Sequence, residues 1–474
     1  MASTPSSPPS PFPSKPPEAW EPLLRIARVA SKPLERFLHI EAASGLLLLA
    51  ASAVALLWAN SQWADGYRHF WHTPLAIRVG SFAFERTLEW FVNDALMVVF
   101  FFVVGMEIRR EIHHGELSEW RRAVLPVVAA AGGMLAPAGV YLALAGSRAT
   151  HSGWGVPMAT DIAFAVGILT LFGKRVPPAL RVLLLALAVI DDLGAIIVIA
   201  LFYSSGIALS GLAIAALGFV GILVMQRLGV RAKMAYVAPA VVAWAGIYTA
   251  GVHPTIAGVV IGVITPVRAW LGPGGFLTDV RKEVDHLAQT SLERLSSHEL
   301  AETLRHVNFA RREAMSPAES LIEVLHPWVA FGIMPIFALA NAGVTLTGTT
   351  LDAASWQVVL GVAAGLIVGK PVGILLAVWL TLKLGFGALP LGLTARHLLV
   401  LGIVAGVGFT MALFIAQLAF EDAQLLAAAK LGVLVASGGA GVLALALGRL
   451  LLPEPSETEG AAQCADEAES STIA

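Results

Sequence analysis

Long apolar runs without a charged residue alternate with short polar segments along the whole chain. Ala42–Ala64, Ala123–Ser147, Leu193–Gln226 and Met234–Val267 contain no Asp, Glu, Lys or Arg. A helix needs about 20 consecutive apolar residues to cross the hydrocarbon core of a bilayer. The pattern therefore predicts an all-α polytopic membrane protein.

The apolar runs divide into about twelve predicted transmembrane helices. We place them at residues 35–59, 91–108, 123–145, 151–172, 178–203, 209–226, 233–249, 252–267, 321–342, 357–381, 397–420 and 427–450. The stretch 234–267 is too long for one helix and too short for two full ones. Gly251, His253 and Pro254 are expected to divide it into two short segments inside the bilayer.

The basic residues predict the orientation of these helices. With the N-terminus inside, 25 of the 31 Lys and Arg residues fall on the inner side, five fall on the outer side, and Lys370 lies within a span. This distribution follows the positive-inside rule. An even number of spans then places both termini in the cytoplasm.

Composition and charge exclude several classes of protein. Apolar residues make up 57% of the chain and charged residues 14%, whereas about a quarter of a soluble domain is charged. The net charge of −2 gives no general attraction to nucleic acid, and the single cysteine, Cys464, cannot form an intrachain disulfide. A soluble enzyme, a disulfide scaffold and a nucleic-acid binder are excluded.

Polar stretches define the domain limits. Residues 1–32 form a cytoplasmic leader that is rich in Pro and Ser, and 453–474 form an acidic cytoplasmic tail; both are expected to be disordered. Residues 33–452 form the transmembrane domain. Its outer loop, 61–90, contains an alternating stretch that predicts a β-hairpin, and its inner loop, 268–318, is predicted to carry an amphipathic helix that covers the inner face.

Four ionisable residues from three spans lie at the same membrane depth. Asp191 and Asp192 follow Arg181 by ten and eleven residues, Asp161 follows His151 by ten, and Lys370 precedes Lys383 by thirteen. Ten helical residues cover about 15 Å, half of a ~30 Å core. Each such charge costs about 2.5–3.5 kcal/mol on insertion scales.

The sign of these charges favours a transport site. A structural alternative is a buried ion pair that joins two helices. However, three carboxylates and one ammonium leave up to two uncompensated negative charges, which require protons or cations. Carboxylates, the Thr160 hydroxyl and free backbone carbonyls are oxygen ligands that suit a small hard cation. The set therefore predicts a site that exchanges protons for such a cation.

Glycine and proline interrupt two of the predicted spans. Gly155 and Pro157 precede Thr160 and Asp161 in the fourth span, and Gly406 and Gly408 lie near the centre of the eleventh. Close helix packing through small residues is the alternative explanation. The interrupted spans are second in the triplets 3–5 and 10–12, as inverted repeats would place them; two interrupted helices that cross are what the resemblance described below implies.

Eight short phrases carry a resemblance to a known family. They are Asn93-Asp-Ala-Leu-Met97, Gly105-Met-Glu-Ile-Arg-Arg-Glu111, Ala159-Thr-Asp-Ile-Ala-Phe-Ala165, Asp191-Asp-Leu-Gly-Ala-Ile196, Gly251-Val-His253, Leu325-His-Pro-Trp328, Gly369-Lys-Pro371 and Gly406-Val-Gly-Phe-Thr-Met411. Residues 33 to 450 thereby resemble the bacterial sodium/proton antiporters of the NhaA type. That family is itself a standard example of inverted repeats with broken helices.

The resemblance implies a function. It implies electrogenic exchange of Na⁺ or Li⁺ for H⁺ across the bacterial inner membrane, which regulates intracellular pH and sodium. It also leads us to expect a homodimer formed through the outer loop 61–90. No cofactor and no nucleic-acid partner are expected.

The resemblance also implies roles for single residues. Asp191 and Asp192 match the aspartates of the family's exchange site, with Asp192 as the direct ligand of the transported cation. Lys370 resembles the lysine that pairs with the first aspartate. Asp161 resembles the carboxylate that lies between the facing helix ends. The residues that match or lie near the family's pH-responsive set are Glu107, Arg110, Glu111, His253, Glu323 and His326. For each histidine a purely structural role is the competing interpretation.

One departure from the family pattern concerns that pH-responsive set. Ile322 stands where the family has an acidic residue, with Glu323 one residue later and Glu319 a turn earlier. The inner loop before it is also longer than expected. The pH range of activity is therefore open, whereas the exchange site is intact.

Other transport and membrane functions stay open as alternatives. A sodium-coupled symporter of an organic anion on a related fold would need hydrogen-bond donors beside the carboxylates. An intramembrane aspartyl protease would need its two aspartates on different helices, whereas Asp191 and Asp192 are adjacent. A cation channel is disfavoured because Lys370 would block the conduction path.

Overall fold

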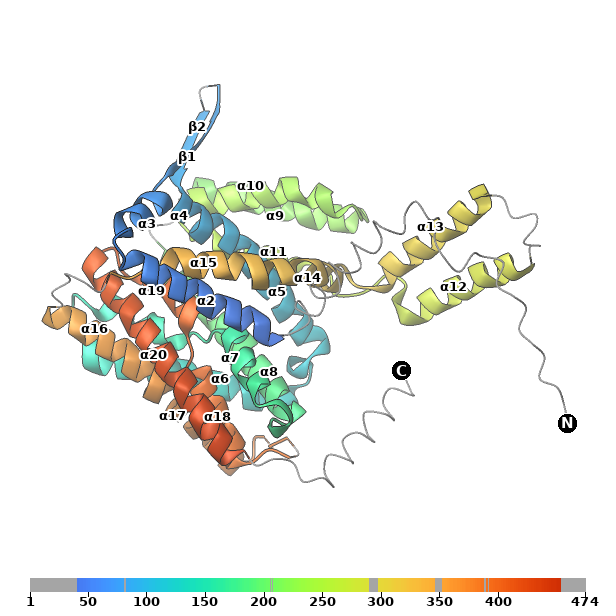
Figure 1. The fold of residues 1–474 in the computed structure, drawn as a ribbon. Coiled ribbons are helices and arrows are strands. Elements are labelled where there is room, and N and C mark those ends of the chain that lie inside the picture. Colours follow the sequence, from blue (N-terminus) through green and yellow to red (C-terminus); the bar gives the residue numbers. More distant parts are fainter. Residues whose placement is uncertain are drawn as a thin grey trace, which may run out of the picture.

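Helices make up nearly all of the described chain (Figure 1). The computed structural model describes residues 41–452 except 81, 205, 207, 290–296, 346–351, 388 and 391. The predicted leader 1–32 and tail 453–474 lie outside the described residues, as do residues 33–40, which include the start of the first predicted span. The predictions for these segments stay predictions.

Each of the twelve predicted spans contains a helix or a pair of helices. In the first half of the chain these elements are α2 (Glu41–Ala59), α4 (Leu88–Trp90) continued through the π-helical turn η2 (Phe91–Leu96) into α5 (Met97–His114), α6 (Trp120–Ala145), the 3₁₀ segment η4 (His151–Met158) with α7 (Ile162–Leu171), α8 (Pro178–Phe202) and α9 (Leu209–Arg227). Short 3₁₀ turns, η3 (Glu116–Ser118) and η5 (Gly173–Arg175), lie in the connections between them.

The second half repeats this style of long, interrupted helices. Its elements are the 3₁₀ turn η6 (Lys233–Tyr236) with α10 (Val237–Thr249), α11 (Thr255–Ile264), α14 (Pro317–Trp328) continued through η8 (Val329–Ile333) into α15 (Met334–Asn341), α16 (Ala353–Ala364) continued through η9 (Gly365–Gly369) into α17 (Lys370–Lys383), α18 (Ala395–Ala405), α19 (Phe409–Ala419) and α20 (Ala423–Leu451). The turns η8 and η9 are π-helical.

Length and composition confirm an all-α polytopic membrane protein. Among the described residues eight helices are long and apolar enough to cross a membrane, and ten spans result if each of two bent helix pairs is one span. The short helices α10 and α11, of 13 and 10 residues, supply the remaining two predicted spans. The break between them falls at Gly251–Pro254, as predicted.

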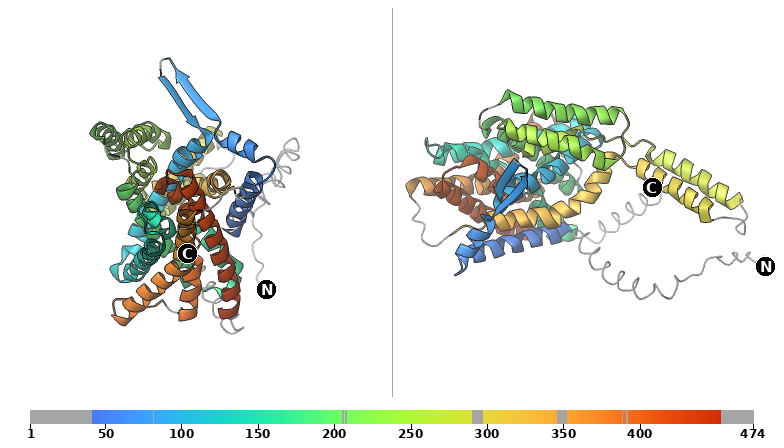
Figure 2. Two further views of the ribbon diagram at one scale, coloured as in Figure 1. Left: turned by 90° about the vertical axis from the view of Figure 1, so that its left-hand side faces the viewer. Right: turned by 90° about the horizontal axis from the view of Figure 1, so that it is seen from above.

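The outer loop 61–90 contains a short helix and the predicted hairpin. Helix α3 (Ala64–Trp71) is bent by 116° from α2. Strands β1 (Pro74–Val79) and β2 (Phe82–Thr87) pair antiparallel, with Pro74 opposite Thr87 and Val79 opposite Phe82. The hairpin projects beyond the helices in Figures 1 and 2.

The inner loop 268–318 differs from its prediction. Instead of one amphipathic helix on the inner face, α12 (Gly272–Gln289) and α13 (Ser297–Ala314) form a pair that extends away from the bundle (Figures 1 and 2). Thr303 and Ala310 are buried, and His306 Nδ1 lies 3.1 Å from Glu283 Oε1 across the pair. Part of α13 is therefore buried within this pair, whereas Leu304 and Phe309 on the same helix are 52% and 51% exposed.

Small residues allow the helices of the bundle to approach closely. A Cβ atom on Gly105 of α5 would lie 2.5 Å from the carbonyl oxygen of Val259 on α11, and one on Gly262 would lie 2.5 Å from that of Phe102. These contacts bring two backbones together as in other small-residue interfaces of membrane helices. The pairing fixes α5, which carries polar residues at both of its ends.

Candidate functional site

Both predicted helix interruptions are present. Segment η4 ends at Met158, residues Ala159–Asp161 are not helical, and α7 begins at Ile162. In the other span α18 ends at Ala405, and α19 begins at Phe409 with its axis bent by 45°. Backbone groups that helices would satisfy are therefore left over inside the bilayer.

The two interruptions satisfy each other. The backbone N–H of Asp161 donates to the carbonyl oxygen of Val407 over 2.8 Å, and the Thr160 hydroxyl lies 3.0 Å from the carbonyl oxygen of Ala405. A Cβ atom on Gly406 would lie 2.6 Å from the carbonyl oxygen of Leu366, so glycine is required for this close approach. The predicted crossing of the two broken helices is thus confirmed.

Asp161 accepts hydrogen bonds from the N-terminal ends of two helices. Its Oδ1 accepts from the backbone N–H of Phe164 at 3.0 Å, which caps α7. Its Oδ2 accepts from the backbone N–H of Thr410 at 3.1 Å and from the hydroxyl of Thr410 at 2.5 Å. A buried negative charge here balances the partial positive charge of both helix N-termini.

Lys370 and Asp191 form the buried ion pair that the sequence predicted. Lys370 Nζ lies 2.6 Å from Asp191 Oδ2, and both side chains are at most 1% exposed. The ammonium also donates to the carbonyl oxygen of Met158, where the partly negative C-terminal end of η4 lies. The Thr160 hydroxyl is 2.7 Å from the same Asp191 oxygen.

Asp192 is the carboxylate whose hydrogen-bonding capacity is unused. Within the described part of the chain, Asp191 Oδ1 and both oxygens of Asp192 are buried without a hydrogen-bond partner. Asp192 interacts electrostatically with Asp191, Asp161 and Glu107, and with Lys370 as the counter-charge. The site therefore presents carboxylate oxygens, with a surplus of negative charge, to any small cation or proton that enters.

Part of the predicted pH-responsive set lies in the C-terminal half of α5. Glu107 interacts electrostatically with His326 and Arg110, and also with Asp192 of the exchange site. Glu111 Oε1 accepts a 2.7 Å hydrogen bond from the backbone N–H of Glu116, where the chain leaves α5. Glu111 thus has a structural partner.

Glu323 and its neighbour Ile322 occupy different environments. Ile322 is 7% exposed, so the position where the family has an acid is part of the apolar core. Glu323 is exposed, and its charge interacts with that of Lys233 on η6. Its role in a pH response stays a prediction.

His253 does not join the group around Glu107. Its Nε2 lies 3.6 Å from Asp94 Oδ1, and its Nδ1 lies 2.8 Å from the Thr255 hydroxyl. Asp94 and Glu107 are thirteen residues apart on one helix, or about 20 Å. Because α11 packs parallel to α5, with Gly258 beside Val98 and Gly262 beside Phe102, His253 lies at the Asp94 end of this span and away from Glu107.

Several polar residues of this region were not predicted from the sequence. Thr410 lies in the eleventh predicted span without a predicted role. Asp94 is an ionisable residue within the second predicted span, in addition to the four that are predicted to form the exchange site. The pair Asp94–His253 could have been suspected from the charge-free stretch that follows Asp94 as far as Met106. The partners of Thr410 could not, since they depend on the crossing.

A multi-span helical bundle with two broken helices that cross at a surplus of buried carboxylates defines a secondary ion transporter. Residues 35–447 match the protein family described as Na⁺/H⁺ antiporter 1. The chain belongs to this family and is a membrane transporter that exchanges Na⁺ for H⁺.

Similar proteins cover nearly the whole chain. It is 71% identical to the Na⁺/H⁺ antiporter NhaA 2 of Myxococcus xanthus over 96% of this chain and 97% of that protein. It is 56% identical to NhaA 2 of Sorangium cellulosum over 96% and 98% of the two chains. It is 49% identical to NhaA of Bordetella petrii over 92% and 95%. The similarity therefore includes both broken helices.

Removing Lys370 should destabilise the protein. In Lys370→Ala the Asp191 carboxylate is buried without its counter-charge, a loss of typically about 3–5 kcal/mol. We expect a lower melting temperature in detergent and weakened exchange. Response of the remaining exchange to an imposed membrane potential decides whether Lys370 also carries a transported proton.

Two variants serve as controls for that experiment. Lys383→Ala removes an exposed lysine from the same helix, α17, and should leave the melting temperature nearly unchanged. The double variant Lys370→Met with Asp191→Asn removes both charges and should recover much of the stability. A normal melting temperature with normal electrogenic exchange in Lys370→Ala would disprove the importance of the pair.

Proposed function

We propose that Na⁺, or Li⁺, and H⁺ compete for Asp191 and Asp192 and are exchanged across the membrane by alternating access. The observation that carries this proposal is the set of three carboxylate oxygens that are buried without a hydrogen-bond partner among the described residues. A buried, unpaired carboxylate is costly. Either a proton or a bound cation relieves that cost, so the two ions are natural competitors.

We propose different roles for the two adjacent aspartates. Oδ2 of Asp191 is engaged by Lys370 and Thr160, so this residue holds the site together. Neighbouring helix residues point about 100° apart. Asp192, free of these contacts, is then the direct ligand, with Asp191 Oδ1 and backbone carbonyls at the crossing as further oxygen ligands for a hard cation.

The symporter alternative finds less support in these contacts. An organic anion would need hydrogen-bond donors, and the donors beside the carboxylates, Lys370 and the Thr160 hydroxyl, already serve Asp191. The surplus of negative charge around Asp192 would also repel an anion. The site therefore favours exchange of cation for proton.

We propose that Glu107, Arg110 and His326 tune the entry of cations from the inner side. Glu107 and Asp192 interact electrostatically, so any change in the charge of this group changes the field at the exchange site. For Glu111 and His253 the contacts in the structure support structural roles. The exchange of Na⁺ for H⁺ serves the regulation of intracellular pH and sodium.

The location follows from the family and from the charge pattern. We propose the bacterial inner membrane, with both termini in the cytoplasm, because 25 of 31 basic residues fall on one side of the predicted spans.

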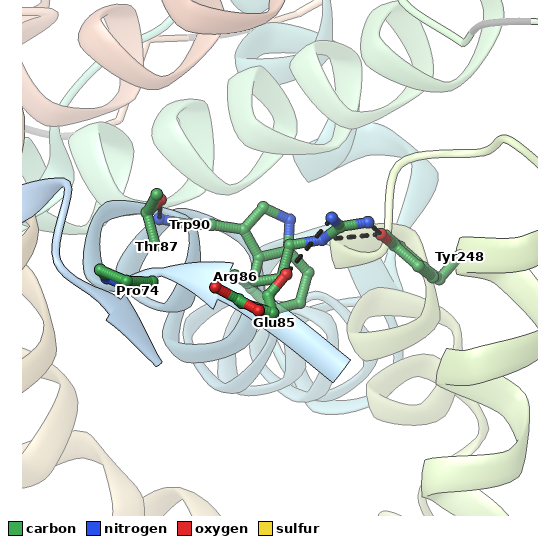
Figure 3. Close-up of a pocket in the computed structure, with 6 residues that line it drawn as sticks. All are labelled: Pro74, Glu85, Arg86, Thr87, Trp90 and Tyr248. Atoms are coloured by element: carbon green, nitrogen blue, oxygen red, sulfur yellow. Dashed lines mark hydrogen bonds between the residues drawn. The ribbon is translucent and has the colours of Figure 1, made fainter. Parts of the chain in front are cut away.

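We also propose a homodimer formed through the outer loop 61–90. Arg86 fixes the base of the hairpin: it lies 5.8 Å from the ring centroid of Trp90 and donates to the hydroxyl of Tyr248 on α10 (Figure 3). These residues line an open cavity of about 500 Å³. Beyond this base, no further strand of the described residues pairs with either edge of the hairpin, and such edges invite a further strand.

The first test of the exchange site replaces its direct ligand. Asp192→Asn keeps the shape of the side chain but can neither release a proton nor bind a cation by charge, so exchange in proteoliposomes should stop while the protein still inserts and folds. Asp65→Asn, which changes a 95% exposed carboxylate in α3, is the matched control. Robust Na⁺/H⁺ exchange by Asp192→Asn would rule out the assigned ligand.

The second test concerns pH. A carboxylate must lose its proton before it binds a cation, so apparent Na⁺ affinity should rise by about tenfold per pH unit while one proton is displaced, and then level off. Cation-dependent proton movement in vesicles, measured over a pH series, gives this affinity. An affinity that is constant from acid to alkaline pH would contradict competition for shared carboxylates.

The third test concerns the dimer. Replacing residues 76–85 by an Asn-Gly turn shortens the hairpin but keeps Arg86 and its contacts with Trp90 and Tyr248. We expect light scattering in detergent to show a shift from dimer to monomer, with exchange per protomer retained. A variant that stays fully dimeric would show that another surface forms the interface.

A further inference from the structure

Three helices meet outside the exchange site, and each contributes one phenylalanine and one carboxamide. These helices are α5 with its preceding turn η2, α15 and α19. The six side chains are Phe101, Phe337, Phe414, Asn93, Asn341 and Gln417. Phe101 lies at the middle of its span, and the other five lie towards the predicted outer ends of theirs. None of the six belongs to the exchange site or to the predicted pH-responsive set, although the ring centroid of His253 lies 5.3 Å from that of Phe414.

The phenylalanines form an apolar layer. The ring centroids of Phe101 and Phe414 are 5.3 Å apart, and those of Phe337 and Phe414 are 6.1 Å apart. The three side chains are at most 1% exposed. A bare cation cannot pass such a layer, because hydrophobic constrictions exclude both ions and water.

The carboxamides form a polar layer further out. Asn341 Nδ2 donates to Asn93 Oδ1 over 2.7 Å, and Asn93 Nδ2 donates to Gln417 Oε1 over 2.6 Å. Gln417 Nε2 in turn donates to Glu89 over 3.2 Å. The Glu89 side chain is 27% exposed and 3.9 Å from His72 of the outer loop. The hydrogen-bonded chain therefore runs from the apolar layer to the outer surface.

Helix α19 links these layers to the exchange site. Thr410, Phe414 and Gln417 are spaced by four and three residues and so share one face of the helix. Thr410 donates to Asp161 at the crossing, Phe414 completes the apolar layer, and Gln417 completes the polar layer. A displacement of α19 at the crossing would therefore also move Phe414 in the apolar layer and Gln417 in the polar layer.

We propose that these six residues are the outer gate for the transported cation, and that the gate opens when α19 moves away from α5 and α15. The proposal rests on the exchange function stated above. Neutral amides suit a gate that must open repeatedly, since an amide hydrogen bond exchanged for water changes the free energy by only about 1 kcal/mol. An ion pair buried at the same place would be far harder to separate.

The test cross-links the gate in the full-length protein. In a Cys464→Ser background, which removes the single native cysteine, Asn93→Cys with Gln417→Cys joins α5 to α19 by oxidation or a short bis-thiol linker. We expect exchange in proteoliposomes to fall at least tenfold on cross-linking and to return on reduction. Asn93→Cys with Asn341→Cys joins the two helices that do not move apart in this proposal, so its cross-linked form should exchange within twofold of its own reduced form.

Two measurements separate the gate from the exchange function. Na⁺-dependent thermal stabilisation of the cross-linked protein should persist, because the proposed gate controls only the outer path to the site. Exchange by the cross-linked Asn93–Gln417 pair within twofold of the reduced form, or equal inhibition by the control pair, would overturn the gate. Loss of exchange in the uncross-linked Cys464→Ser protein would instead overturn the proposed function.

A protein with one reporter cysteine provides an independent readout that does not need a cross-linked pair. Gln417→Ala removes one amide of the polar layer. In right-side-out vesicles we expect Met411→Cys, one turn inward of the gate, to react at least threefold faster with an impermeant thiol reagent when Gln417→Ala is also present. An unchanged labelling rate would contradict the gate.

Discussion

Two helix N-termini that face each other inside a bilayer need a negative charge between them, and Asp161 supplies it. Breaking a helix in a membrane leaves N–H and C=O groups that lipid cannot satisfy. Asp161 accepts from the backbone N–H groups at the start of α7 and α19, while the carbonyl oxygen of Val407 accepts from the backbone N–H of Asp161. Without this carboxylate the crossing would leave polar backbone groups unpaired at membrane depth.

The same crossing creates the chemical difference between two adjacent aspartates. Lys370 compensates the carbonyl end of η4 and also holds Asp191, so the ion pair is a part of the scaffold. Asp192 shares the environment but none of these contacts. Asp191 is therefore engaged in structural contacts, whereas Asp192 stays available to a proton or a cation.

Polar groups on either side of the crossing are distributed along two helices. Glu107 lies in the C-terminal half of α5, and Asn93 and Asp94 lie about 20 Å away in the turn that precedes this helix. Helix α19 carries the contact to Asp161 at its start and the contact to Asn93 near its end. Rigid helices of this kind can join events at the exchange site to both membrane faces.

The sequence by itself determined the membrane class, the positions of the spans, the two interruptions and the depth of the charges. These follow from local rules: hydropathy fixes a span, glycine and proline break it, and the 1.5 Å rise per residue fixes the depth of Asp161, Asp191, Asp192 and Lys370. The resemblance to a family added the pairing of Lys370 with Asp191. All of these features depend on order along the chain.

Only the tertiary structure decided which polar atoms meet. Asn93 and Asn341 are 248 residues apart, and Asp161 and Thr410 are 249 apart, so no local pattern relates them. The rotation of each helix about its axis decides whether His253 faces Asp94 or the inner group, and which oxygens of Asp191 and Asp192 stay unpaired. A one-residue rotation turns a side chain by about 100°, and span boundaries read from hydropathy are too coarse to fix that angle.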